Sequence, residues 1–208
     1  GNLDADSGRA VLEYLAEYSG LHAEWAPNEK VAVEVALGAS MAGARALATM
    51  KHVGVNVAAD PIFTASYTGV RGGLVIVTAD DPEMHSSQNE QDNRHYAIAA
   101  KIPMLEPSDS AEAKAYTKLA FALSERFDVP VFLRTTTRVS HATGAVVLGD
   151  VEPPAVPLGF VEEPAKWVML PVNARRRHVL VEERMRALRE FAETFEGNRI
   201  EWGDRALG

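Results

Sequence analysis

Glu29 is the first residue whose surroundings suggest chemistry. It follows Pro27 and Asn28 and stands just before VAVEVALGASMAGA (31–44), a stretch built largely from Ala, Val, Gly, Ser and Met. Such a stretch predicts a helix that begins near the acid. Either the carboxylate only complements the helix N-terminus, a contribution under about 1 kcal/mol, or the small side chains let a large group come close to it.

A second stretch rich in functional groups is DDPEMHSSQNEQDNRHYA (80–97), which mixes carboxylates, amides, hydroxyls and imidazoles. It follows the clearest buried-strand pattern in the chain, LVIVTADD (74–81). Ligands of open parallel α/β sheets bind beyond the carboxyl ends of the strands. We therefore favour a functional loop over an ordinary polar surface loop, and expect MKHVGVN (50–56) and Glu29 at the same sheet edge.

Other chemistries find little support in the residue pattern. None of the six histidines forms an i,i+4 pair or an HExxH motif, so nothing indicates a metal site. The Ser140–His141 pair and the His85–Ser87 run lack the GxSxG elbow of a hydrolase. The glycines within 69–73 do not form GxGxxG, which leaves a nicotinamide site unsupported.

Composition limits the class of protein. The 208 residues are 47% apolar, enough for one sizeable core or for one domain with an appendage. A net charge of −8 argues against nucleic acid and anionic membrane as partners. The chain has no cysteine, so it holds no thiolate metal site or iron–sulfur cluster of its own. With no signal peptide and no long apolar run, we expect a soluble, cytoplasmic protein.

The elements that position these residues alternate along the first 150 residues. This pattern predicts an α/β domain, a parallel sheet with helices on both faces. Expected strands lie at 22–25, 45–50, 74–81, 102–105 and 129–137. One helix is expected to end at Ser19–Gly20, and a second to begin after Asn28. A third helix should span 55–67 with a break at Pro61, and a fourth 109–127. A loop is expected at 51–54. The last helix carries a capping-box pattern, Asp109 with Glu112.

The chain changes character near residue 149. We assign 1–148 to the α/β domain and 149–208 to a proline-rich, acidic linker followed by an amphipathic helix. The apolar face of that helix is predicted at four positions: Val181, Met185, Leu188 and Phe195. We interpret its Arg175–Arg177 run as a solvated face, because the net charge is negative.

Long strings of the sequence resemble one enzyme family. NEKVAVEVALGASMAGARALATMKHVGVNVAADP, GGLVIVTADDPEMHSSQNEQDNRHYA, AKIPMLEPSDSAEAK, LRTTTRVSH and MLPVNARRRH are similar to the N-terminal region of indolepyruvate:ferredoxin oxidoreductase alpha subunits. The resemblance runs from about Ala10 over nearly the whole chain. It implies a thiamin diphosphate enzyme related to pyruvate:ferredoxin oxidoreductase, with residues up to about 148 forming the pyrimidine-binding module.

The resemblance assigns roles to individual residues. Glu29 matches the catalytic glutamate that hydrogen-bonds N1′ of the cofactor's aminopyrimidine ring, which favours the 4′-imino tautomer that removes the thiazolium C2 proton. Further cofactor-binding positions match at Lys51, His52, Gly54 and Asn56. Substrate-binding positions match at His85, Ser86, Ser87, Gln88 and Asn89. In pyruvate-using relatives this segment holds an arginine; its replacement by Gln88 or a neighbour implies a pocket for a larger aryl pyruvate.

Departures from the family pattern suggest a piece of a longer enzyme rather than a degenerate stand-alone homologue. The chain lacks the first strand and the GYPGTPS-type loop, and it has no GDG…N motif for magnesium and diphosphate. We therefore expect another domain to hold the magnesium, and iron–sulfur clusters to lie only elsewhere in the full enzyme. Helix packing through Ala32, Ala36, Ala39 and Gly43 suggests close contact with a partner domain and a homo-oligomer.

The leading functional hypothesis is the pyrimidine-binding part of a 2-oxo-acid:ferredoxin oxidoreductase. The full reaction converts an aryl pyruvate and CoA to aryl-acetyl-CoA, carbon dioxide and reduced ferredoxin, with the remaining alpha-subunit domains and a beta subunit as partners. We expect the isolated chain to be inactive. The alternatives are a non-catalytic assembly domain and a thiamin-dependent 2-oxo-acid decarboxylase subunit; the presence of Glu29 argues against a purely structural role.

Overall fold

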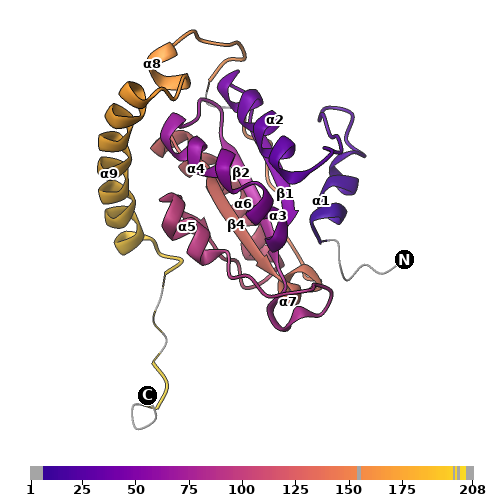
Figure 1. Cartoon of the computed structure of the whole chain (residues 1–208). Helices are drawn as coiled ribbons and strands as arrows, with labels where there is room; N and C mark the ends of the chain where they lie inside the picture. Colours follow the sequence, from indigo (N-terminus) through magenta and orange to yellow (C-terminus); the bar gives the residue numbers. More distant parts are fainter. Residues whose placement is uncertain (1–6, 154–155, 199, 201, 205–208) are drawn as a thin grey trace.

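A computed structural model describes residues 7–153, 156–198, 200 and 202–204 (Figure 1). Four parallel strands form one sheet in the order β1-β2-β4-β3. Their bounds are β1 Ala46–Lys51, β2 Leu74–Asp80, β3 Met104–Leu105 and β4 Val131–Thr136. The predicted α/β class with a parallel sheet is confirmed.

Helices cover both faces of this sheet, because side chains of the central strands alternate between two apolar clusters. Leu74 and Ile76 of β2 pack into the cluster formed with α2, α3, α4 and α5. Val75 and Val77 pack into the cluster formed with α6. All seven positions of β2 are buried, as expected for a parallel strand covered on both faces.

The helices are bounded as follows: α1 Ser7–Leu15, α2 Glu29–Met41, α3 His52–Val57, α4 Ala59–Thr68, α5 Arg94–Ala100, α6 Ser110–Phe127, α7 Thr137–Ser140, α8 Pro164–Trp167 and α9 Pro171–Thr194. A short 3₁₀ turn, η2, spans Pro82–Met84. Helices α2 to α5 lie on one face of the sheet and α6 on the other, and α9 runs alongside α4 (Figure 1).

Side-chain caps begin the two helices with the clearest sequence signals. The Oδ1 atom of Asn28 accepts from the backbone amide of Val31 at 3.0 Å, so that α2 begins at Glu29. The Oδ1 atom of Asp109 accepts from the amide of Glu112 at 2.8 Å. Glu112 in turn accepts from the amide of Ser108 at 2.8 Å, one residue before the cap. The predicted capping pattern therefore forms, with its return bond shifted by one residue.

Three local predictions are wrong. Residues 22–25 form no strand, and the side chains of Leu21 and Trp25 are exposed. The segment 51–54 is no loop, because α3 starts at His52 directly after β1. The break in the following helix lies at Ala58, between α3 and α4, rather than at Pro61, which occupies the first turn of α4 where its missing amide is not needed.

Two buried arginines attach α9 to the α/β body. Arg177 donates from Nε to the carbonyl of Tyr67 at 2.6 Å and from Nη2 to the carbonyl of Thr68 at 3.1 Å. Arg184 donates from Nη1 to the carbonyl of Ser66 at 2.8 Å. These carbonyls belong to the last turn of α4, which lacks helical donors. The guanidinium groups thus cap α4, and burial lowers the pKa of Arg184 to about 10.

Asp128 is the acidic centre of this attachment. Its carboxylate accepts from Arg177 Nη2 at 2.9 Å, from Lys166 Nζ at 2.9 Å and from the amide of Val70 at 2.9 Å. The interpretation of Arg175–Arg177 as a wholly solvated run is therefore wrong for Arg177, although its two neighbours are exposed. Helical periodicity turns one of three adjacent arginines toward the body.

The apolar face predicted for α9 packs as expected at two positions. Val181 and Leu188 are buried, while Met185 is partly buried. Phe195 lies just past the end of the helix and stacks on Phe191, with ring centroids 5.5 Å apart. The C-terminal segment is therefore packed onto the domain through both charged and apolar contacts.

Replacing Arg177 tests this attachment. We expect Arg177→Met to lower the free energy of unfolding of the 208-residue chain by about 2–3 kcal/mol, because the carbonyl of Thr68 and the carboxylate of Asp128 lose a charged donor. The matched variant Arg176→Met changes an exposed neighbour and should stay within about 0.5 kcal/mol of the wild type. Urea unfolding followed by circular dichroism measures both, and equal losses in the two variants would refute the attachment.

Candidate functional site

Glu29 lies against Gly54, and this contact joins the N-terminal ends of α2 and α3. A Cβ atom added at Gly54 would lie 2.6 Å from Glu29 Cγ and 3.0 Å from Glu29 Oε1. It would also lie 3.0 Å from the Cβ of Met50. Any side chain at position 54 would therefore displace the carboxyl group. Two residues that the sequence analysis assigned to the site are in direct contact.

The small residues of α2 and of the turn after it pack mainly inside this chain. Ala36 is buried in the apolar cluster under α2. A Cβ atom at Gly43, where φ is +87°, would lie 2.7 Å from the carbonyl oxygen of Pro157. Ala32 and Ala39 are partly buried. For Ala36 and Gly43, the expected close packing is thus made within the chain itself.

The start of α3 also contacts the predicted substrate segment, residues 85–89. Lys51 Nζ donates to the carbonyl of Ser86 at 3.0 Å. His52 is fully buried, and its Nε2 atom is 3.0 Å from the carbonyl of Asn89. Glu29, the 51–54 segment and the 85–89 segment therefore meet at the carboxyl edge of β1 and β2, as the sequence predicted.

Asp81, directly after β2, organises the beginning of this segment. Its carboxylate accepts from the backbone amides of His85 at 3.1 Å and Ser86 at 2.8 Å, and from the Thr137 hydroxyl at 3.1 Å. Burial would raise the pKa of Asp81, but these hydrogen bonds lower it to about 2. Asp81 lies in the predicted polar stretch 80–97 but was not predicted individually; its place at the end of the strand was the available signal.

The neighbouring acid, Asp80, is used internally. It accepts from Arg134 Nε at 2.6 Å and from the amide and Nδ2 of Asn93 at 3.2 and 2.9 Å. Burial would lower the pKa of Arg134, but its bonds to Asp80 and Glu106 raise it. All three of Asp80, Asn93 and Arg134 are buried. This network holds the start of α5 against β2 and β4, and its members were not predicted individually.

The remaining predicted residues lie nearer the surface. The side chains of His85, Gln88 and Asn89 are exposed, and those of Ser86 and Ser87 are partly buried. Asn56, at the end of α3, donates to the hydroxyl of Tyr96 on α5 at 2.5 Å. Among the contacts of the described residues, that bond places Asn56 toward α5 rather than beside residues 85–89.

The turn before the segment has an unusual backbone. Glu83 and Met84 have φ angles of +66° and +56°, a left-handed conformation that residues with side chains seldom adopt. The amide of Glu83 donates to Glu90 at 2.8 Å, which closes the loop on itself. Two consecutive left-handed residues beside predicted site positions are consistent with a functional loop.

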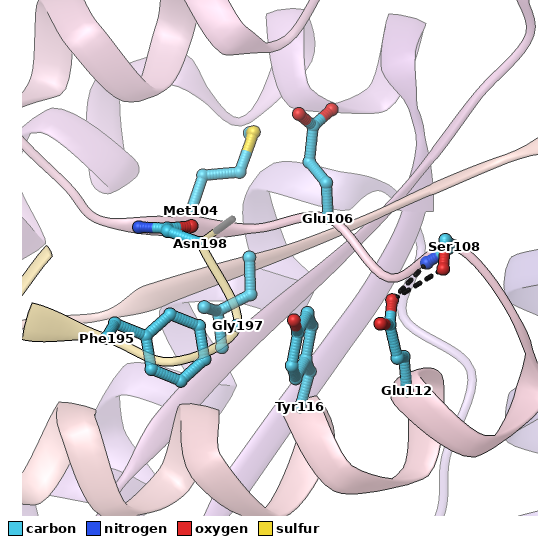
Figure 2. A pocket seen from close by; sticks show the side chains of 9 residues that line it. Met104, Glu106, Ser108, Glu112, Tyr116, Phe195, Gly197 and Asn198 are labelled. Atoms are coloured by element: carbon cyan, nitrogen blue, oxygen red, sulfur yellow. Dashed lines mark hydrogen bonds between the residues drawn. The ribbon is translucent and has the colours of Figure 1, made fainter. Parts of the chain in front are cut away.

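A cavity of about 500 Å³ opens elsewhere, between β3, α6 and the chain after α9 (Figure 2). Its wall includes Met104, Tyr116 and Phe195, and the bonded pair Ser108–Glu112 lies at one side. None of the predicted site residues lines it. We therefore assign the candidate site to the β1–β2 edge rather than to this cavity.

Neither a metal-binding cluster nor a membrane-spanning helix is found among the residues that the structure describes. In those residues, no group of three or more His, Cys, Asp or Glu side chains could hold a metal ion. No helix within them is long and apolar enough to cross a membrane.

Comparison with known proteins links this geometry to one family. Residues 9–178 match the family described as "Pyruvate flavodoxin/ferredoxin oxidoreductase, thiamine diP-bdg". The chain is 52% identical over 203 residues to indolepyruvate oxidoreductase subunit IorA of Archaeoglobus fulgidus, covering 96% of this chain and 31% of the relative. The subunit of the same name from Methanothermobacter marburgensis is 48% identical over 190 residues, covering 91% and 31%. The chain thus spans about a third of these relatives.

Solved structures share the fold at low sequence identity. The 2-oxoglutarate:ferredoxin oxidoreductase from Magnetococcus marinus superposes with a TM-score of 0.68 at 14% identity, over 90% of this chain and 41% of that one. Benzoylformate decarboxylase from Polynucleobacter necessarius gives a TM-score of 0.53 at 17% identity, over 71% and 28%. The resemblance noted in the sequence is confirmed: the chain belongs to the pyruvate flavodoxin/ferredoxin oxidoreductase family and matches its thiamin diphosphate-binding domain.

Proposed function

We propose that this chain is the pyrimidine-binding part of an enzyme that oxidatively decarboxylates indolepyruvate or a related aryl pyruvate to an acyl-CoA, with ferredoxin as electron acceptor. The observation that carries the proposal is the Glu29 carboxyl group, seated against Gly54 at the carboxyl edge of a parallel sheet. The family match supports the cofactor, and relatives named indolepyruvate oxidoreductase support the substrate class.

The residues at this edge fit one half of thiamin diphosphate. Glu29 is partly exposed, so its carboxyl can face a ring nitrogen, and the missing side chain at Gly54 leaves room beside it. The diphosphate and its magnesium ion require carboxylate or amide oxygens and phosphate ligands together. In the described residues, no group of three or more His, Cys, Asp or Glu side chains could hold that ion. Another domain of the full enzyme therefore holds that half of the cofactor, and the isolated chain is inactive.

The role of this chain in the reaction is to hold a proton. Thiamin diphosphate, when bound, supplies the electron sink for decarboxylation of a 2-oxo acid. With thiamin diphosphate bound, Glu29 would share a proton with ring nitrogen N1′, which would keep the amino side of the ring able to act as a base. The first turn of α2, capped by Asn28, fixes the position from which Glu29 does this.

Residues 85–89 form the substrate side of the proposed site. Gln88 and His85 are exposed there, and the segment carries no arginine or lysine. An uncharged polar lining accepts an indole ring better than a buried cation would. The family resemblance places Lys51, His52, Gly54 and Asn56 on the cofactor side. Magnesium and iron–sulfur clusters lie elsewhere in the enzyme. The assembly includes the other alpha-subunit domains, a beta subunit and a second copy of this chain. It is located in the cytoplasm.

Removing the acid of Glu29 tests the proposed function. In the complete enzyme, Glu29→Gln should lower kcat by about 100-fold or more, because the amide keeps the shape but cannot hold the shared proton. Glu34→Gln changes an exposed acid of the same helix and serves as the matched control. Dye reduction with indolepyruvate and CoA measures both. Activity of Glu29→Gln within a few-fold of the control would remove Glu29 from the mechanism. CO₂ release without dye reduction or use of CoA would indicate a decarboxylase instead.

A methyl group at position 54 tests the contact itself. Gly54→Ala places a carbon 2.6 Å from Glu29 Cγ, so the carboxyl must move. We expect kcat/KM to fall by about 10- to 100-fold, as small misplacements of catalytic groups do. Gly38→Ala, where an added Cβ meets nothing within 4 Å, is the control and should remain active. If both variants keep full activity while circular dichroism shows them folded, the contact between Glu29 and Gly54 does not contribute to catalysis.

A cation in the substrate segment tests specificity. Gln88→Arg should shift preference from indolepyruvate toward pyruvate or acidic 2-oxo acids, because a desolvated guanidinium disfavours an indole and attracts a carboxylate. The measured quantity is the ratio of kcat/KM for indolepyruvate to that for pyruvate. An unchanged ratio would mean that Gln88 does not face the substrate.

A further inference from the structure

The 85–89 segment is held mainly at its main-chain groups, beside a longer side-chain bond from the Ser86 hydroxyl to Asp81 at 3.4 Å. From β2, the Asp81 carboxylate binds the amides of His85 and Ser86. From the adjacent strand β1, Lys51 Nζ binds the carbonyl of Ser86. The far end is held where the His52 ring meets the carbonyl of Asn89. The donors that reach its carbonyls therefore come from the junction of β1 and α3.

The chemistry of the His52 contact assigns the proton of its ring. A carbonyl oxygen only accepts, so Nε2 carries the hydrogen and donates it to Asn89 at 3.0 Å. Nδ1 is buried without a hydrogen-bond partner among the described residues. The side chain is 0% exposed. A ring buried in this way cannot contact a ligand without moving, and the polar contact that it makes among the described residues is to the segment.

We propose that Lys51 and His52 are positioning residues, which set the main chain of residues 85–89 and thereby the selection of the 2-oxo acid, and which touch neither cofactor nor substrate. This rests on the proposed function, in which Gln88 and its neighbours face the substrate. It replaces the cofactor-binding role that the family resemblance implied for these two residues. Their donors fix the backbone, which leaves the exposed side chains of the segment free to determine which substrate fits.

Three substitutions at His52 distinguish the effect of where its hydrogen-bond donor lies from the effect of side-chain volume. In Gln, the amide nitrogen stands as many bonds from Cβ as Nε2 does in histidine, so His52→Gln can still reach Asn89. In His52→Asn the amide nitrogen lies one bond nearer to Cβ, and in His52→Leu there is no donor. We expect KM for indolepyruvate to rise about 3- to 10-fold in the Leu and Asn variants, as for loss of one hydrogen bond, with Gln close to wild type.

The readouts are taken in the complete enzyme and compared with His95→Leu, a change of an exposed histidine on α5. The proposal expects kcat and the dissociation constant for thiamin diphosphate to change less than twofold in His52→Gln and His52→Asn. Lys51→Met should raise KM in the same way. If His52→Asn weakens cofactor binding and leaves KM unchanged, or if Gln and Asn behave alike, the positioning role is wrong.

Hydrogen exchange distinguishes failure of this inference from failure of the proposed function. Amides of residues 85–89 should exchange faster in the Leu and Asn variants than in His52→Gln, wild type or His95→Leu. This ordering does not depend on turnover. If wild type consumes no 2-oxo acid, the proposed function fails while the exchange ordering still decides whether His52 holds the segment. Equal exchange in all variants would overturn the positioning role.

Discussion

The burial of β2 on both faces is the constraint on which the rest of the molecule depends. Its side chains alternate between the α2–α5 layer and α6, and none of its seven positions is exposed. Polar groups that must reach a ligand can therefore leave the sheet only where the strand ends. The same packing that stabilises the sheet thus concentrates the site at one edge, where β2 ends in two consecutive acids.

Asp80 and Asp81 make different interactions because their surroundings differ. Asp80 faces inward, where the buried Arg134 and Asn93 use its oxygens, so it anchors α5. Asp81 faces the loop and binds amides, which lowers its pKa to about 2. A depressed pKa contributes stability that is present above the ordinary aspartate value and is lost as pH falls toward 2. Near neutral pH the loop is therefore held by an acid that stays ionised.

Charge also explains how an acidic chain uses its arginines. Three of them are adjacent in α9, yet the one that is buried caps the carbonyl end of α4 and meets Asp128. Buried guanidinium groups need several acceptors, and the end of a helix provides carbonyls without partners. The C-terminal segment is thereby fixed to the domain.

The sequence by itself determined the parallel sheet, its buried central strand, the start of α2, the cap of α6, and the segments that meet at the candidate site, because each has a strong local signal of composition, periodicity or capping. It misplaced the start of α3, since Lys51 makes no side-chain cap there, and it proposed a strand at 22–25 that has no neighbour to pair with. Only the tertiary structure decided that Gly54 meets Glu29, that His52 reaches Asn89, and that Arg177 alone of its run is buried. These contacts join residues 25 to 110 positions apart, and side-chain packing between elements, which no local pattern encodes, brings them together.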